Sequence, residues 1–459
     1  MLSRTSKSVC GLGSLWLGSW LALAPQMAAG QEDKPPHLLL EPTEFTDVID
    51  AFDGNDDPLD FNVRLSFVRS QEDAVIERER NAVGAFAVDT LDVAEYRAIS
   101  SALVLGAEIG LYKDLMVFGR LPLVFSDTRE LRLPESARCD SNACALHAQQ
   151  ITSVLDDRPP GAEDPSPVFS PNPPLESRER SGVPAVDAGV AWGIMNQYRE
   201  PGLPTWVVLL EARFGIGATM NACIKVKEAT EPCAPGLSRG TTRLKFGSRW
   251  SYRYRFIEPY LGLDYAHEWA TSASEAFAPG GDGAHLVDTG LPSVAGITLG
   301  GAIVPWEHRG RFQRFTIDIR ARAEYVTAGR DYTPLFDALG KSKNQYLSAP
   351  QTTDAGETIE FNGLTQVDAY ARLGLDLALA MQAARYVRFR VDFTLSHMTR
   401  HLLTGAAACT DESASMPSDD CGDNAHNALY RPVIDLPGQR FFMSSDLAYT
   451  LSATATAQF

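Results

Sequence analysis

Strict alternation of apolar and polar residues recurs along this chain in stretches of about ten residues or more. From Phe61 to Phe67 the odd positions are apolar and the even positions are polar. From Thr242 to Tyr254 apolar and aromatic residues alternate with a row of arginines and a lysine. A period of two residues is typical of a β-strand whose two faces meet different surroundings. The pattern therefore predicts that strands are the main element of this chain.

Marking every such stretch predicts strands at residues 59–70, 95–112, 115–131, 184–198, 205–217, 241–254, 256–270, 293–306, 312–327, 364–381, 386–398 and 439–459. A soluble sandwich has the same local alternation, but these strands are long enough to cross a membrane when tilted. Short predicted turns alternate with long connections, as in outer-membrane barrels with tight periplasmic turns and long extracellular loops. We therefore predict an all-β fold, a transmembrane antiparallel up-and-down β-barrel of about twelve strands.

The short turns are predicted at Lys113 and Asp114, at 199–204, near Arg255, at 307–311 and at 382–385. The longest connection runs from Leu133 to Gly182 and is rich in proline. Because proline has no backbone N–H and restricts its neighbours, we expect this connection to be irregular.

The chain divides into three predicted regions. Residues 1–30 resemble an export signal, because Arg4 and Lys7 precede an apolar run that small residues follow. Residues 31–57 form an acidic segment that we expect to be solvated in the periplasm, and residues 58–459 form the barrel. A calcium site is the alternative for this segment, since carboxylates gather around its turn residues at Asp47, Asp50, Asp53, Asp56 and Asp57. Their spacing matches no calcium loop that we know, so no metal site is predicted.

Six cysteines follow the predicted signal, and they fall into three local pairs. The pairs are Cys139 with Cys144, Cys223 with Cys233, and Cys409 with Cys421. Each pair lies in a different long loop, and a loop-internal disulfide needs the least chain closure. We predict three such disulfides, formed in an oxidising compartment. Metal binding is the weaker alternative, because neither a CxxC motif nor paired histidines accompany the cysteines.

The last strand alternates up to the terminal Phe459. At this point the sequence resembles the Gram-negative outer-membrane β-barrel proteins of the channel and transporter type. The resemblance implies that the barrel assembly machinery reads Phe459, that lipid and lipopolysaccharide surround the barrel, and that the protein resides in the bacterial outer membrane. Mean hydropathy of −0.14 is compatible with this fold, since only every second strand residue faces lipid.

Charged residues on the inward positions supply the candidate site. The predicted lumen-lining set is Arg243, Lys245, Arg249, Arg253, Asp264, Glu268, Asp318, Arg320, Arg322, Arg372, Asp376, Arg388, Arg390 and Asp392. The two signs nearly balance, so the interior is either a narrow aqueous channel or a plugged polar core. If the strands face one space, the arginines and the lysine form a cationic stripe that favours anionic solutes. The alternative is that they pair with neighbouring acids such as Asp264, Glu268 and Asp392.

These observations favour a passive channel for small solutes, with no cofactor. A net charge of −17 argues against a nucleic-acid partner, because phosphate binding needs clustered cations. A structural or surface-recognition barrel that displays disulfide-tied loops is the alternative. An outer-membrane hydrolase is the third hypothesis, with His267 beside Glu268, or His397 near Ser396 and His401, as candidates. No nucleophile elbow accompanies these histidines, so the sequence favours a protein that is not an enzyme.

Overall fold

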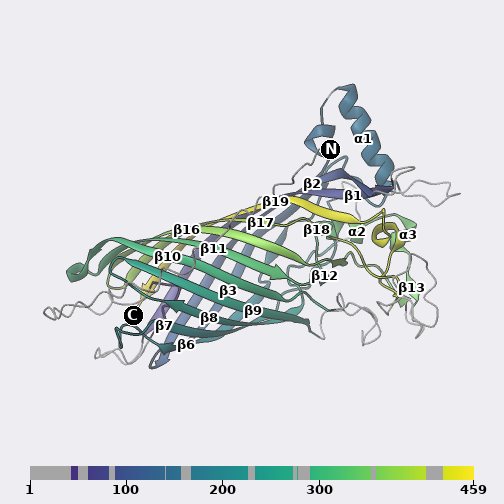
Figure 1. Cartoon of the computed structure of the whole chain (residues 1–459). Coiled ribbons are helices and arrows are strands. Elements are labelled where there is room, and N and C mark those ends of the chain that lie inside the picture. Colours follow the sequence, from purple (N-terminus) through teal and green to yellow (C-terminus); the bar gives the residue numbers. More distant parts are fainter. Residues whose placement is uncertain are drawn as a thin grey trace, which may run out of the picture. The chain divides into compact units, whose positions relative to one another are not determined.

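Twelve long antiparallel strands form a closed barrel in the computed structural model of the chain (Figure 1). The structure describes residues 43–49, 60–81, 88–139, 141–156, 167–225, 233–271, 277, 290–352, 358–409 and 427–459. These residues all belong to one compact unit, residues 36–459. The predicted signal at 1–30 lies outside the described residues and stays a prediction.

Each barrel strand pairs with the next one along the chain. The strands are β1 (Phe61–Asn81), β2 (Val88–Tyr112), β3 (Leu115–Arg132), β6 (Ala185–Met195), β7 (Thr205–Gly215), β8 (Thr241–Ser251), β9 (Ile257–Ala270), β10 (Val294–His308), β11 (Gln313–Val326), β16 (Tyr370–Ala384), β17 (Val387–Met398) and β19 (Phe441–Gln458). The first and last strands close the barrel, with Asn62 opposite Gln458 and Arg78 opposite Phe441. Every predicted strand overlaps one of these, so the predicted fold is confirmed.

The two ends of the barrel segment meet at the closing pair of strands. The N–H of Phe61 donates to the carbonyl of Phe459 at 3.1 Å, and the N–H of Phe459 donates back at 2.9 Å. The two phenyl rings stack with centroids 6.4 Å apart. These hydrogen bonds leave no open sheet edge at this point, which a barrel in lipid requires.

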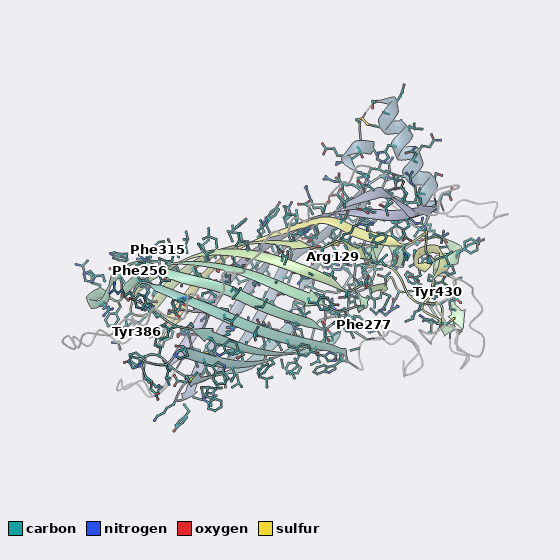
Figure 2. All side chains as sticks on the ribbon, in the orientation of Figure 1. Arg129, Phe256, Phe277, Phe315, Tyr386 and Tyr430 are labelled. Carbon is teal, nitrogen blue, oxygen red and sulfur yellow. A yellow bond between two sulfur atoms is a disulfide. The ribbon has the colours of Figure 1, made fainter. Side chains whose placement is uncertain are left out.

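The outer face of the barrel carries large apolar side chains on strand after strand (Figure 2). Phe67, Phe246, Leu299, Leu375 and Leu451 are 45–56% exposed. Their sequence neighbours point inward and are mostly polar, as the two-residue period predicts. Exposed apolar residues at such regular positions are favourable only where lipid tails surround them. Among the described residues, no helix has the length and apolarity that crossing a membrane requires.

The short connections lie at the predicted positions. Asp114 and Arg255 adopt left-handed conformations with φ of 53° and 55°, and η3 (Arg309–Arg311) turns the chain between β10 and β11. The Asp114 carboxylate accepts a hydrogen bond from Asn196 Nδ2 at 2.6 Å and pairs with Arg199 at 3.0 Å. Asp114 thereby ties the β2–β3 turn to the β6–β7 turn.

The described parts of the long connections lie at the opposite end of the barrel, where β1 and β2 extend well past the length that crosses a bilayer. The smaller elements are η2 (Glu135–Ala137), α1 (Asn142–Leu155), β4 (Leu175–Glu176), β5 (Arg180–Gly182), β12 (Gly329–Asp331), α2 (Phe336–Gly340), α3 (Gln345–Ser348), β13 (Gln351–Thr352), β14 (Thr358–Ile359), β15 (Thr365–Val367), β18 (His401–Leu402) and α4 (Pro432–Asp435). We call this assembly the cap. Its apolar core includes the fully buried Ile76, Val93, Leu155, Leu335 and Ile434.

The prediction that the loop from Leu133 to Gly182 is irregular is wrong for its first half. Helix α1 lies there, and Ser141 caps it by accepting a hydrogen bond from the Cys144 N–H at 3.3 Å. Apart from Pro134, which precedes the helix, the prolines of the loop lie in its second half, so the residues of α1 are free to form a helix. Ile151 and Leu155 of the helix are buried in the cap core.

Two of the three predicted disulfides are present in the structure. Cys139 pairs with Cys144 with a Cα–Cα distance of 5.5 Å, and Cys223 pairs with Cys233 at 6.0 Å. The third pair stays a prediction, because Cys421 lies outside the described residues.

Candidate functional site

A short piece of the N-terminal region, Thr43–Ile49, lies inside the barrel; we call it the lumen segment. The Thr43 N–H donates to Glu258 Oε2 at 3.0 Å, and the hydroxyls of Thr46 and Ser251 are 2.7 Å apart. Thr46 is only 1% exposed. The expectation of a solvated lead-in is therefore wrong for this part of the region 31–57. The boundaries of that region stay a prediction, since its remaining residues lie outside the described part.

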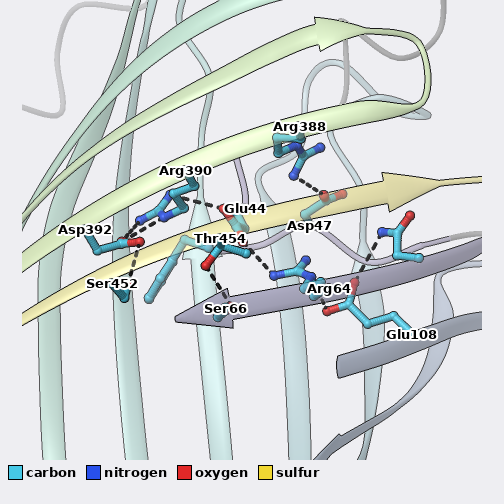
Figure 3. Close-up of polar contacts among 12 residues, drawn as sticks. Glu44, Asp47, Arg64, Ser66, Glu108, Arg388, Arg390, Asp392, Ser452 and Thr454 are labelled. Atoms are coloured by element: carbon cyan, nitrogen blue, oxygen red, sulfur yellow. Dashed lines mark hydrogen bonds and ion pairs between the residues drawn. The ribbon is translucent and has the colours of Figure 1, made fainter. Parts of the chain in front are cut away.

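Ion pairs with wall arginines make the burial of the acidic lumen segment favourable. Glu44 pairs with Arg64 at 2.6 Å and with Arg390 at 3.1 Å, from strands β1 and β17 (Figure 3). Asp47 pairs with Arg388 at 3.6 Å. A buried carboxylate is costly unless cations and hydrogen bonds satisfy it, and the inward arginines supply both. The remaining acids of the calcium alternative lie outside the described residues.

The ring of Phe45 occupies a slot in the barrel wall. It stacks on Tyr260 with ring centroids 4.2 Å apart and planes inclined by 22°. The guanidinium carbons of Arg249 and Arg320 lie 5.1 and 5.9 Å from the Phe45 centroid. A stacked aromatic ring and nearby cations both stabilise an aromatic group, through area burial and through attraction to its π face.

Two inward glycines give this slot its depth. A Cβ added at Gly262 would lie 2.7 Å from Cζ of Phe45, and a Cβ added at Gly300 would lie 2.5 Å from the ring of Tyr260. Real side-chain contacts are longer than this, so any larger residue would force one of the rings to move. The hydroxyl of Tyr260 also donates to Asp318, which fixes the ring from its far end.

Among the cavities bordered by described residues, two lie along the lumen. The first, which we call the inner cavity, has a volume of about 360 Å³ and borders the lumen segment, with Arg64, Arg120, Arg249, Arg390 and Asp392 in its wall. The second, the outer cavity, has a volume of about 430 Å³ and lies nearer the cap, with Arg129, Arg322, Glu324 and Arg372 in its wall. The predicted interior is thus polar and partly filled.

The predicted lumen-lining charges fall into two groups. Most of them form ion pairs within the barrel wall, and the rest depend on contacts with the lumen segment. Lys245 pairs with Asp264 at 3.1 Å and Arg390 with Asp392 at 2.7 Å, as the pairing alternative expects. The other pairs were not foreseen and are Arg243 with Glu211 at 4.0 Å, Arg322 with Asp376 at 2.7 Å, Arg372 with Glu324 at 3.3 Å, Arg253 with Glu307 at 3.8 Å, Glu268 with Arg239 at 3.0 Å, and Arg320 with Asp318.

Among the described residues, Arg249 and Arg388 pair with no carboxylate of the barrel wall, and both contact the lumen segment. Arg249 donates to the Phe45 carbonyl at 3.2 Å, and no carboxylate among the described residues pairs with it. Arg388 pairs with Asp47 of the segment and donates to Gln382 at 3.1 Å. Both cations therefore depend on the segment for part of their polar contacts.

Glu44, Phe45 and Tyr260 are the site residues that sequence reasoning missed. None of them belongs to the alternating pattern of charged inward residues that drew attention to the lumen. The glycines at 262 and 300 were a usable signal, because small inward residues on neighbouring strands leave room for something else. What fills that room is set by contacts between distant parts of the chain.

The histidines of the hydrolase hypothesis lie apart from this site. His267 Nδ1 is 2.8 Å from Ser293 Oγ, while its neighbour Glu268 points the other way and pairs with Arg239. His397 Nδ1 contacts the carbonyl of Asp446 at 2.6 Å, and His401 Nδ1 contacts the carbonyl of Thr399 at 2.7 Å. The geometry thus brings His267 of β9 together with Ser293, which lies just before β10 and is not one of the candidates named from the sequence.

No protein-family model matches the chain, and the comparison with curated proteins finds no match. Solved outer-membrane barrels are similar in structure. An outer membrane channel from Pseudomonas putida F1 is 8% identical with a TM-score of 0.41, over 91% of this chain and 99% of that chain. A Pseudomonas aeruginosa FadL homologue is 6% identical with a TM-score of 0.31, over 87% and 90%. The outer membrane protease OmpT from Escherichia coli is 8% identical with a TM-score of 0.27, over 87% and 96%.

These likenesses assign no activity to the chain, and the fold rests on the strand pairings described above. The barrel is of the bacterial outer-membrane type. Its closed sheet satisfies the backbone groups that lipid cannot, and its apolar outer face matches the hydrocarbon. Lipid therefore surrounds the wall, while the lumen segment and the two cavities lie within it.

Proposed function

We propose that this protein is a channel for small anionic solutes and that the lumen segment closes it in the state described here. The segment is held by side chains. Within the described residues, no ladder hydrogen bonds join Thr43–Ile49 to a barrel strand, and its main-chain contacts with the wall go to the side chains of Glu258 and Arg249. A segment held in this way can leave without breaking the sheet.

The observation that carries the proposal is that wall arginines satisfy the two acids of the lumen segment. If the segment leaves, Arg388 loses Asp47 and both Arg64 and Arg390 lose Glu44. The wall then has an excess of cations facing the inner cavity. A small anion that enters replaces the lost carboxylates, which gives anions an advantage over cations in this part of the pore.

Planar-bilayer recording tests this proposal. The wild-type protein is expected to remain mostly closed, because the segment occupies part of the lumen beside the inner cavity. A double variant, Glu44→Gln with Phe45→Ala, is expected to give steady currents whose reversal potential in a salt gradient shows anion preference. Heat-modified migration of the folded barrel on a gel establishes that the variant is intact. A folded variant that stays silent would contradict the proposal.

The matched control for the double variant lies away from the lumen segment. Phe67→Ala with Glu77→Gln also removes one aromatic ring and one carboxylate, from the lipid face and from the cap. Because neither residue contacts the lumen segment, this control is expected to keep the closed behaviour of the wild type. Currents in the control would show that any loss of packing opens the barrel.

Surface recognition is the second candidate function, and the cap is the observation that favours it. The cap has an apolar core of its own, and buried arginines hold its segments together. Such a rigid surface is suitable for presenting loops to a partner. Neither proposal assigns a catalytic step, and hydrolase activity stays a hypothesis. Silence of the open variant together with binding of the cap to a surface ligand would favour recognition over conduction.

A further inference from the structure

We infer that the slot occupied by Phe45 and Glu44 is a binding site for small aromatic carboxylates, and that the lumen segment fills it as an internal substitute. This inference rests on the proposed channel function, because it names the solute class that the same lumen accepts. Phe45 supplies an aromatic ring and Glu44 supplies a carboxylate, on adjacent residues. The wall meets each group with the side chains that would recognise it in a free molecule.

The aromatic half of the site is shaped for a flat ring. Tyr260 stacks on one face of the ring at 4.2 Å, and two guanidinium groups, from Arg249 and Arg320, lie within 6 Å of its centroid. Gly262 leaves the space that the ring edge needs. A saturated ring of similar size would fill the space, but it would lose the attraction between the cations and a π face. The slot therefore distinguishes aromatic from aliphatic groups.

The carboxylate half of the site is a pair of arginines. Arg64 and Arg390 approach Glu44 from opposite sides, at 2.6 and 3.1 Å. Charge-assisted hydrogen bonds from two guanidinium groups are among the strongest that a carboxylate can accept. Neutral molecules cannot replace this interaction, so the site also selects for an acid.

The wall holds both halves in place without the lumen segment. Arg64 also pairs with Glu108 at 2.9 Å, and Arg390 also pairs with Asp318 at 3.0 Å. Tyr260 is fixed by its hydrogen bond to Asp318. Because these partners belong to the barrel, the site keeps its shape when Phe45 and Glu44 leave. Preorganisation of this kind lowers the cost of binding a free ligand.

The site is also large enough for a free molecule. The inner cavity beside the segment has a volume of about 360 Å³, and its wall includes Arg64, Arg249 and Arg390. Volumes of this order are typical of pockets for small organic molecules. A ligand that displaces Phe45 gains the slot in addition to this space.

Isothermal titration of the purified full-length chain in detergent tests the inference with 3-phenylpropanoate as the probe. The comparison compounds are 3-cyclohexylpropanoate, which lacks the π face, and 3-phenylpropanamide, which lacks the charge. The double variant Glu44→Gln with Phe45→Ala is expected to bind the probe about tenfold more tightly than the wild type, because the internal competitor is gone. It is also expected to prefer the probe over either comparison compound by about tenfold.

Two further substitutions in that background separate the halves of the site. Arg390→Gln is expected to remove the preference for the acid over the amide, and Tyr260→Leu the preference for the aromatic over the cyclohexyl acid. Arg400→Gln, which changes an exposed pair with Glu77 in the cap, is the control and is expected to leave binding unchanged. Equal binding of all three compounds by the double variant would overturn the inference.

A measurement on the wild type keeps the test independent of variant folding. Hydrogen exchange of the peptide that contains Thr43–Ile49 is expected to accelerate in 3-phenylpropanoate and not in 3-phenylpropanamide, because only the acid displaces the segment. Unchanged exchange at saturating probe contradicts the inference. Binding without any current in the double variant would remove the channel proposal alone, whereas current without selective binding would remove only the aromatic carboxylate site.

Discussion

Phe45 and Tyr260 lie face to face inside the barrel, with ring centroids 4.2 Å apart. Phe45 belongs to the lumen segment and Tyr260 to β9, so this contact fixes a strand-free part of the chain to the wall. Arg249 and Arg320 complete the surroundings of the Phe45 ring. Together with the ion pairs of Glu44 and Asp47, this ring contact holds the lumen segment against the wall.

Filling the slot from the wall side should open the lumen. Gly262→Ala places a methyl group 2.7 Å from Cζ of Phe45, which is too close for the ring to stay. We expect a higher open probability in bilayer recordings and faster hydrogen exchange in Thr43–Ile49. Gly119→Ala is the matched control, since the nearest atom to its added Cβ is the Asp187 carbonyl oxygen at 3.7 Å. Similar opening by both variants would contradict the slot model.

Reversing the charge of one wall arginine should change ion preference. Arg249 lines the inner cavity and contacts Phe45, whereas Arg253 pairs with Glu307 nearer the short turns. In the background of the open double variant, Arg249→Glu is expected to shift the reversal potential toward cations. Arg253→Glu is the comparison and should shift it less. An unchanged reversal potential for Arg249→Glu would show that this residue does not face the conducting water.

The cap should depend strongly on the buried pair of Arg180 and Asp337. The side chain of Arg180 is 0% exposed and pairs with Asp337 at 2.7 Å, and Asp337 also accepts the Cys223 N–H at 2.9 Å. Asp337→Ala leaves a buried cation unpaired and is expected to destabilise the cap by about 3 kcal/mol. Native-state proteolysis of the loops measures this change.

An exposed pair in the same region supplies the control. Lys225 and Glu176 are 2.7 Å apart, and their side chains are 51% and 50% exposed. Glu176→Ala is expected to change cap stability by less than about 1 kcal/mol, because water screens the pair. Equal effects of the two substitutions would show that the Arg180 pair is not buried in solution.

The titration of Asp435 should stabilise the cap as the pH falls from 7.5 to 5. Burial raises the pKa of Asp435 to about 6, although the N–H groups of Arg431, Gly405 and Ala406 oppose the rise by donating to its carboxylate. The folded pKa lies above the unfolded one, near 3.9, so this contribution to stability is full below about pH 4 and is lost as the pH rises through 6.

Hydrogen exchange at Gly405 and Ala406, corrected for intrinsic rate, measures the expected gain, on the order of 1 kcal/mol between pH 7.5 and pH 5. Asp435→Asn cannot titrate and should remove this contribution. Protection that falls with falling pH in the wild type would give the opposite sign and contradict the assignment.

The third disulfide can be tested directly. Non-reducing digestion and mass spectrometry should give linked peptides for Cys139 with Cys144 and for Cys223 with Cys233, the pairs seen in the structure. We expect a third linked peptide that joins Cys409 to Cys421. Linkage of Cys421 to a cysteine of another loop would contradict the prediction that each disulfide joins two cysteines of the same loop.

The strands could be predicted because the residues of each strand show the two-residue period without reference to the rest of the chain. Lipid on one side and a polar lumen on the other impose a two-residue period, which is visible in a short local stretch such as Phe61 to Phe67. The turn at Asp114 and the closing strand that ends at Phe459 follow from the same local pattern. Helix α1 was not predicted, because the prolines that follow it indicated an irregular conformation for the whole loop.

The sequence by itself determined a barrel with charged inward faces, since every strand repeats that information. Only the tertiary structure decided what occupies the lumen and which charges pair, because Glu44 meets Arg390, and Phe45 meets Tyr260, across long stretches of chain. Such contacts depend on barrel closure, strand register and the room left by Gly262, and no local period encodes them.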